Sequence, residues 1–142
     1  MRTLVVDASV ALKWLVLEDM SDVAKELYGA GDRLIAPRLI TTEIANALAR
    51  KTMQGMLTRQ EATYHFSSLP LFLPDLMDVD ELIEPAFENA CTLRHPIYDL
   101  LYLEAARKAD TQLVTADRRF TAKIAGTGLA RHVTLLSDWR PQ

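Results

Sequence analysis

The sequence has little of the residue types that mark disulfide-rich and zinc-binding proteins. It contains a single cysteine, Cys91, so no disulfide can form within the chain. Because Cys91 lies in the helical pattern AFENACTLR, we expect a buried and unreactive thiol. The three histidines, His65, His95 and His132, are scattered without the spacing of metal ligands, which argues against a zinc site.

Long apolar runs and glycine-rich phosphate loops are also missing. No apolar run approaches the roughly 20 residues that a membrane helix needs, and the first residues lack the basic segment and cleavage site of a signal peptide. We therefore expect a cytoplasmic protein without a membrane partner. The net charge of −3 argues against broad, non-specific binding of nucleic acid, although a local basic rim could still bind it.

What remains is the composition of a globular protein with a real core. Hydrophobic residues make up 49% and charged residues 25% of the 142 residues. This length suits one domain spanning residues 1–142 and is short for two. Short apolar segments alternate with amphipathic ones, which is typical of an α/β domain with a mainly parallel sheet.

The boundaries of several elements can be predicted from the sequence. The expected strands are residues 3–7, 33–37, 70–74, 111–117 and 133–137. Thr58 and Glu61 have capping-box spacing at the start of one helix, and Gly55 marks the end of the helix before it. Pro85 is expected to begin a helix, because proline suits the first helical turn. Trp14 and Tyr102 lie in helical apolar patterns and are expected in the core.

Four acidic residues stand at equivalent places in this pattern. Asp7 ends the first strand, Glu43 and Asp99 lie near the starts of helices, and Asp117 directly follows a strand. Each one alone could be a helix cap or a charge that stabilises a helix N-terminus. Together they are harder to explain in that way, because the carboxyl ends of parallel strands meet at one edge, where such sheets bind ligands.

A cluster of carboxylates has a definite chemistry. Like charges brought together raise one another's pKa unless a cation lies among them. Oxygen ligands without histidine or cysteine suit Mg²⁺ or Mn²⁺. Basic residues near two of the acids are candidates for contacts to the phosphates of a nucleic acid, although ordinary surface charge explains them equally well: Arg50, Lys51, Arg118 and Arg119.

Four segments, in order, carry a resemblance to a known family. They are LVVDASV, TTEIANAL, YDLLYLEAA and LVTADRRF, and they resemble the PIN-domain nucleases, above all the VapC-type toxins of toxin–antitoxin pairs. The resemblance runs from Thr3 to Leu136. One departure is RHPIYD, since relatives often have a small residue before the acid equivalent to Asp99. This departure concerns the mouth of the pocket rather than the acid.

The resemblance implies a fold, an activity and partners. The fold would be a three-layer α/β/α sandwich with a central, mainly parallel sheet. The activity would be that of an endoribonuclease dependent on Mg²⁺ or Mn²⁺, which cleaves phosphodiester bonds of RNA with a metal-activated water. The partners would be the RNA substrate, a cognate antitoxin protein and a second copy of the chain in a homodimer.

The same resemblance assigns the residues of the site. The four acidic positions of the family fall on Asp7, Glu43, Asp99 and Asp117. We expect Asp7, Asp99 and Asp117 to hold the metal directly or through water, and Glu43 to hold a metal-bound water or a second ion. Polar residues that the family places beside the acids fall on Ser9, Asn46 and Thr115. Of these, Ser9 and Thr115 could orient the carboxylates by hydrogen bonds.

Other functions compete with this interpretation. One alternative is a non-catalytic PIN-like module that binds RNA or protein, and another is a housekeeping nuclease that processes RNA. The retention of all four acids argues against the first. A phosphotransfer receiver domain would need paired acids after the first strand and a late lysine, which the chain lacks. An aspartate-nucleophile phosphatase would need Asp-x-Asp, but residue 9 is a serine.

Overall fold

The fold is built on one parallel sheet in the computed structural model, which describes residues 1–142. The strands are β1 (Thr3–Val6), β2 (Arg33–Pro37), β3 (Leu76–Met77), β4 (Gln112–Thr115) and β5 (Val133–Leu135). They lie in the order β3-β2-β1-β4-β5, and every neighbouring pair is parallel. The central strand β1 is apolar and buried from Leu4 to Val6, as expected for a parallel sheet covered on both faces.

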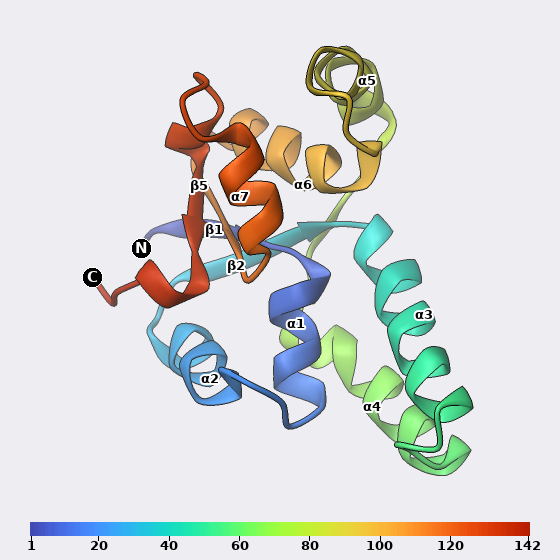
Figure 1. The fold of residues 1–142 in the computed structure, drawn as a ribbon. Helices are drawn as coiled ribbons and strands as arrows, with labels where there is room; N and C mark the ends of the chain where they lie inside the picture. The colour runs from blue at the N-terminus through green and yellow to red at the C-terminus, as the bar shows by residue number, and fades with distance from the viewer.

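Helices form the two outer layers (Figure 1). They are α1 (Ala8–Leu15), α2 (Ser21–Gly29), α3 (Leu39–Met53), α4 (Arg59–Phe72), α5 (Asp80–Leu93), α6 (Ile97–Lys108) and α7 (Arg118–Ile124). Helices α1 to α4 lie on one face of the sheet, whereas α6 and α7 lie on the other, with α5 packed against the outside of α6. The predicted three-layer α/β/α sandwich is confirmed.

The order of the strands fixes where a ligand can bind. The chain moves outward from β1 to β2 and β3, then returns to the other side of β1 with β4 and β5. The crossover helices therefore change face between β1 and β4, and this is the topological switch point of the sheet. Open α/β sheets bind ligands at the carboxyl ends of the strands at such a point.

Helix α6 is the most deeply buried helix of the protein. Its residues from Leu100 to Ala106 are all buried, because the sheet covers one side of the helix and α5 covers another. A helix enclosed in this way is apolar on most of its surface. Its first turn carries Asp99, so this acid stands on a support held in place by the core.

Two boundary predictions are confirmed and two are wrong. Thr58 and Glu61 form the predicted capping box, and Gly55 follows the end of α3 with a positive φ of 76°. Residues 70–74 are not a strand: most of this segment ends α4, where Leu69 and Leu73 bury the same side of the helix. Helix α5 begins at Asp80 rather than at Pro85, because its two leading acids favour an N-terminus there.

The environment of Cys91 also differs from the prediction. Its side chain is exposed rather than buried. Helix α5 is an outer helix that buries only a narrow stripe, which includes Leu82 and Ala86, and Cys91 lies outside this stripe. Trp14 is buried as predicted, and its indole N–H donates a hydrogen bond to the carbonyl oxygen of Ala24. None of the helices combines the length and apolar character needed to cross a membrane.

Candidate functional site

Asp7 lies at the carboxyl end of β1 and caps helix α1. One carboxylate oxygen, Oδ1, accepts hydrogen bonds from the Ser9 hydroxyl at 2.6 Å and from the Val10 N–H at 3.2 Å. The other, Oδ2, accepts a hydrogen bond from the Thr115 hydroxyl. The side chain is therefore an N-cap, as the simplest interpretation of the sequence requires. It is also hydrogen-bonded to Thr115 at the end of the neighbouring strand β4, a contact that capping does not require.

The charge on Asp7 is energetically unfavourable in the folded protein. Asp7 is only 4% exposed, and this burial raises the pKa of its carboxyl group to about 6. The hydrogen bonds from Ser9, Thr115 and Val10 lower this pKa in part, whereas the negative charge of Asp99 raises it further. An acid that is buried beside another acid, and not beside a cation, indicates a site adapted to bind a positive charge.

The hydroxyl groups of Ser9 and Thr115 join β1 to β4 at this edge. The Ser9 oxygen accepts a hydrogen bond from the Ala116 N–H at 3.0 Å while its proton is donated to Asp7. The Thr115 oxygen in the same way accepts one from the Asp117 N–H at 3.1 Å and donates to Asp7. Each hydroxyl thus uses both its donor and its acceptor capacity, and the network fixes both oxygens of Asp7.

Asp117 is the counterpart of Asp7 on the neighbouring strand. It follows β4, caps helix α7 and accepts a hydrogen bond from the Phe120 N–H at 3.0 Å. Since β1 and β4 are adjacent and parallel, the two capping acids emerge at the same edge of the sheet. Both are helix caps and both face the switch point, so the two interpretations of these acids are compatible.

Glu43 reaches the same edge from helix α3. It is half-buried, and its Oε1 accepts a hydrogen bond of 2.5 Å from the hydroxyl of Tyr102 on α6. Burial raises the pKa of Glu43, the hydrogen bond from Tyr102 lowers it, and the charge of Asp99 raises it. Tyr102 itself is buried in the core as predicted, but its hydroxyl faces the acids. Burial and the neighbouring Glu43 raise the pKa of this phenol, which keeps it a neutral donor.

Asp99 stands in the first turn of α6 and is held by a histidine. The Nε2 atom of His95 lies 2.7 Å from Oδ2 of Asp99. The His95 ring packs against Phe120 of α7, with 5.3 Å between the ring centroids. Asp99 remains partly exposed, with 32% of its side chain accessible. The sequence offered only two signals for this contact, the i,i+4 spacing and the departure RHPIYD.

The four predicted acids line one cavity. Its volume is about 190 Å³, and its lining consists of Asp7, Ala8, Ser9, Glu43, Asp99, Tyr102 and Asp117. These residues come from the β1–α1 junction, α3, α6 and the β4–α7 junction, so four separate parts of the chain converge there. Ser9 belongs to this lining, and Thr115 contacts it through its hydrogen bond to Asp7. Tyr102 and His95 were not among the predicted site residues.

The remaining predicted residues lie outside the lining of the cavity. Asn46 is exposed on α3, one turn beyond Glu43. Arg50 and Lys51 lie about 11 Å farther along the same helix than Glu43, and Lys51 forms an ion pair of 3.7 Å with Glu18.

Arg118 and Arg119 are nearer to the acids in the sequence. They follow Asp117 directly and are both exposed at the start of α7, where Arg118 donates a hydrogen bond to Ser137. The exposed start of α7 is therefore the better placed of the two basic segments for contact with a polyanion.

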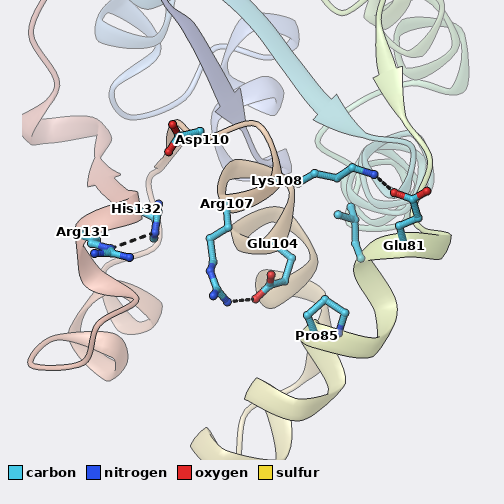
Figure 2. A pocket seen from close by; sticks show the side chains of 9 residues that line it. Glu81, Pro85, Glu104, Arg107, Lys108, Asp110, Arg131 and His132 are labelled. Atoms are coloured by element: carbon cyan, nitrogen blue, oxygen red, sulfur yellow. Dashed lines mark hydrogen bonds and ion pairs between the residues drawn. The ribbon is translucent and has the colours of Figure 1, made fainter.

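A larger cavity of about 450 Å³ lies elsewhere (Figure 2). It lies between α5, α6 and the segment that leads into β5, and Asp110, at its rim, precedes β4 at the amino end of the strands. Its charged groups are largely paired with one another: Arg107 lies 2.6 Å from Glu104, and Lys108 contacts Glu81. None of the four predicted acids lines it, so size alone does not identify the candidate site.

The acidic cavity fits a hydrated divalent cation. No group of three or more Asp, Glu, His or Cys side chains lies close enough together to hold a metal ion directly. Mg²⁺, however, keeps several of its water molecules and is usually bound through only one or two carboxylates. The lining supplies carboxylate and hydroxyl oxygens. Burial raises the pKa values of Asp7 and Glu43, and the charge of Asp99 raises them further, as expected where no cation compensates the acids.

Known proteins resemble this chain in sequence and in fold. The family described as PIN domain matches residues 4–125. A curated relative, Ribonuclease VapC3 of Pyrobaculum aerophilum, is 32% identical over 124 residues, which cover 84% of this chain and 93% of the relative. The crystal structure of PAE2754, also from Pyrobaculum aerophilum, superposes with a TM-score of 0.70 at 20% identity and covers 96% of this chain and 85% of the other. The structural likeness supports the fold alone.

Proposed function

Because the chain belongs to the PIN domain family, we propose that it is an endoribonuclease dependent on Mg²⁺ or Mn²⁺. The observation that carries this proposal is the convergence of Asp7, Glu43, Asp99 and Asp117 on one cavity at the switch point of the sheet. Helix capping accounts only for Asp7 and Asp117, because the N-cap of α3 is Arg38 and that of α6 is Pro96. The relative VapC3 is named as a ribonuclease, which supports RNA as the substrate.

The four acids have different proposed roles in binding the cation. Asp7, Asp99 and Asp117 would hold it, at most two of them directly and the others through its water molecules, and Glu43 would hold one of these waters or a second ion. When bound, the divalent cation would polarise a phosphodiester and lower the pKa of a water molecule, so that hydroxide would be available near neutral pH. Asp7 is buried and Glu43 is half-buried, so both carboxylates are shielded from bulk water and favour a compensating cation.

The polar residues around the acids keep them in place. Ser9 and Thr115 hold both oxygens of Asp7, so the carboxylate is already fixed before a cation arrives. Asn46, exposed one turn beyond Glu43, is proposed to contribute a polar contact at the rim. Arg118 and Arg119 are proposed to contact phosphates of the RNA backbone, with Arg50 and Lys51 as more distant contacts.

The biological role follows from the relative rather than from the site. The name VapC3 belongs to a ribonuclease of the VapC type, and we propose that this chain acts likewise as the toxin of a toxin–antitoxin pair. Its partners would be a cognate antitoxin protein, the RNA substrate and a second copy of the chain in a homodimer. The proposed place of action is the cytoplasm, where RNA is available, and the whole chain of 142 residues is proposed to act as one domain.

The proposal is tested by cleavage of a structured RNA by the purified protein. We expect cleavage with Mg²⁺ or Mn²⁺, no cleavage with excess EDTA, and no cleavage by Asp7→Asn purified in the same way. Asp22→Asn is a suitable control, since Asp22 is an exposed acid in the first turn of α2 and should be dispensable. Cleavage that continues in EDTA would refute the metal-dependent mechanism. Equal activity of Asp7→Asn would indicate a contaminating nuclease and remove the support for this site.

A further inference from the structure

Tyr102 differs from the other tyrosines of the protein. Its exposure is 1%, whereas Tyr28, Tyr64 and Tyr98 are at least 44% exposed. Its ring lies in the core beneath the sheet, but its hydroxyl lies at the wall of the acidic cavity and donates to Glu43. A phenylalanine would fill the same apolar space. The hydroxyl group therefore needs a separate explanation, and the cavity offers one.

The hydrogen bond from Tyr102 restricts a side chain that would otherwise be mobile. Glu43 is half-buried on α3, and its carboxylate extends on three rotatable bonds toward the cavity. The only protein donor to this carboxylate is the Tyr102 hydroxyl, which contacts Oε1 and leaves Oε2 without a protein partner. Fixing such a side chain in the folded protein removes rotational freedom that would otherwise be lost when a cation binds.

Helix α6 sets the positions of two acids, Asp99 by carrying it and Glu43 through the hydrogen bond from Tyr102. Asp99 and Tyr102 are three residues apart on α6, so their side chains lie on the same face of the helix. Asp99 is itself an acid of the site, and Tyr102 reaches across the cavity to an acid on α3. The buried helix thus sets the position of Glu43 relative to Asp99, although the two acids belong to different layers of the fold.

We propose that Tyr102 is a positioning residue, which fixes Glu43 through one carboxylate oxygen so that the other is available to a divalent cation or its water. This inference rests on the proposed function, since it assigns a role within the same metal site. Tyr102 contacts neither the cation nor the RNA in this scheme. Tyr102 acts only through Glu43, so its effect on metal binding should disappear when Glu43 is replaced. A general structural role would not depend on Glu43 in this way.

The first test is the binding of Mn²⁺ to Tyr102→Phe, measured by calorimetry. We expect the dissociation constant to rise about tenfold, at the lower end of the range typical for the loss of an outer hydrogen bond at a metal site. Tyr98→Phe is the matched control, because Tyr98 lies on the same helix, is exposed and makes no hydrogen bond through its hydroxyl. Its affinity for Mn²⁺ should equal that of the wild type.

A double-mutant cycle separates positioning from structure. In a Glu43→Gln background, Tyr102→Phe should change Mn²⁺ affinity by less than twofold, since the carboxylate on which it acts is already lost. The KM for RNA should also stay within twofold of the wild-type value, because Tyr102 does not contact the substrate. An equal loss of affinity in both backgrounds would show that the hydroxyl acts through the structure as a whole and would overturn the proposal.

A measurement that keeps the hydroxyl group of Tyr102 makes the test independent of how well Tyr102→Phe folds. With 3-fluorotyrosine in place of all four tyrosines, the resonances of Tyr28, Tyr64 and Tyr98 are assigned by their phenylalanine variants, and Tyr102 by elimination. Saturation with Mg²⁺ should shift the ¹⁹F resonance of Tyr102 more than any other, and Glu43→Gln should abolish this shift. A resonance that does not move on Mg²⁺ binding would overturn the proposal.

Failure of the proposed function and failure of this inference give different results. If the wild type binds no Mn²⁺ and cleaves no RNA, the metal site itself is refuted, and the role of Tyr102 with it. If the wild type binds Mn²⁺ and cleaves RNA while Tyr102→Phe binds Mn²⁺ equally well, only the positioning role of Tyr102 is refuted.

Discussion

Replacement of Asp7 by asparagine should stabilise the metal-free protein at neutral pH. Asparagine retains the oxygen that accepts the hydrogen bonds from Ser9 and the Val10 N–H, so α1 keeps its cap. The amide NH₂ group would then face Thr115, whose hydroxyl can rotate to accept a hydrogen bond. The substitution therefore removes the buried charge and keeps the packing, while the Thr115 hydroxyl has to turn its proton from residue 7 toward the Ser9 oxygen, 3.5 Å away.

The magnitude follows from the pKa of Asp7. Burial raises this pKa in the folded protein from 3.8 to about 6, a difference of about 2 units, and each unit corresponds to about 1.4 kcal/mol. Between these two values the folded protein holds a proton that the unfolded chain has released. The free energy of unfolding of the wild type therefore decreases as the pH rises from about 4 to about 6, by about 3 kcal/mol in total. The asparagine variant has no such dependence at this position.

The assay is a series of thermal melts in EDTA between pH 4 and pH 8. Near pH 4 the wild type and Asp7→Asn should melt at similar temperatures, and above pH 6 the variant should melt higher by roughly 10 °C. Comparing the two proteins cancels the titration of the other ionisable groups to first order, since both proteins retain them. Asp22→Asn, an exposed first-turn acid of α2, should follow the wild type at every pH. If Asp7→Asn is less stable than the wild type at pH 7, Asp7 serves only as a cap.

Three further predictions concern the metal, the host and the assembly. Millimolar Mg²⁺ should raise the melting temperature of the wild type, because it binds only the folded site, and should raise that of Asp99→Asn less; equal shifts would contradict a shared site. Expression without a partner should arrest growth of the native host, and Asp99→Asn should restore growth while remaining soluble; harmless expression of the wild type would favour a housekeeping nuclease. Light scattering at micromolar concentration should give the mass of a homodimer, so a monomer of 16.0 kDa would refute the proposed assembly.

The sheet and the positions of the four acids could be predicted because they depend on local patterns. The buried strands β1 and β4 are short apolar runs, and the residues that end them, Asp7 and Asp117, follow directly in the sequence. Parallel pairing then places these acids at one edge without further information. Strand β3 is not predicted, because two residues, Leu76 and Met77, are too few to show a period. The apolar run before them is predicted as a strand, although its spacing also fits the end of a helix.

The partners of the acids could not be predicted, because they depend on tertiary structure. Tyr102 and Glu43 are 59 residues apart and meet only because α3 and α6 converge on the same edge of the sheet. His95 reaches Asp99 because the chain turns between α5 and α6, where Arg94 has a positive φ of 52°. This backbone conformation is uncommon for residues other than glycine, so an arginine in the sequence does not predict it. The exposure of Cys91 likewise depends on the position of α5 at the outside of the fold.

The most direct test of the account is a comparison of RNA cleavage by single variants of the four acids under one set of conditions. With saturating Mn²⁺ we predict that Asp7→Asn, Glu43→Gln, Asp99→Asn and Asp117→Asn each lose at least about 100-fold in kcat/KM, a loss of about 2.7 kcal/mol in transition-state stabilisation. Asp22→Asn should retain full activity. If any two of the four variants cleave RNA at the wild-type rate, the acids do not form one catalytic centre, and the account is contradicted.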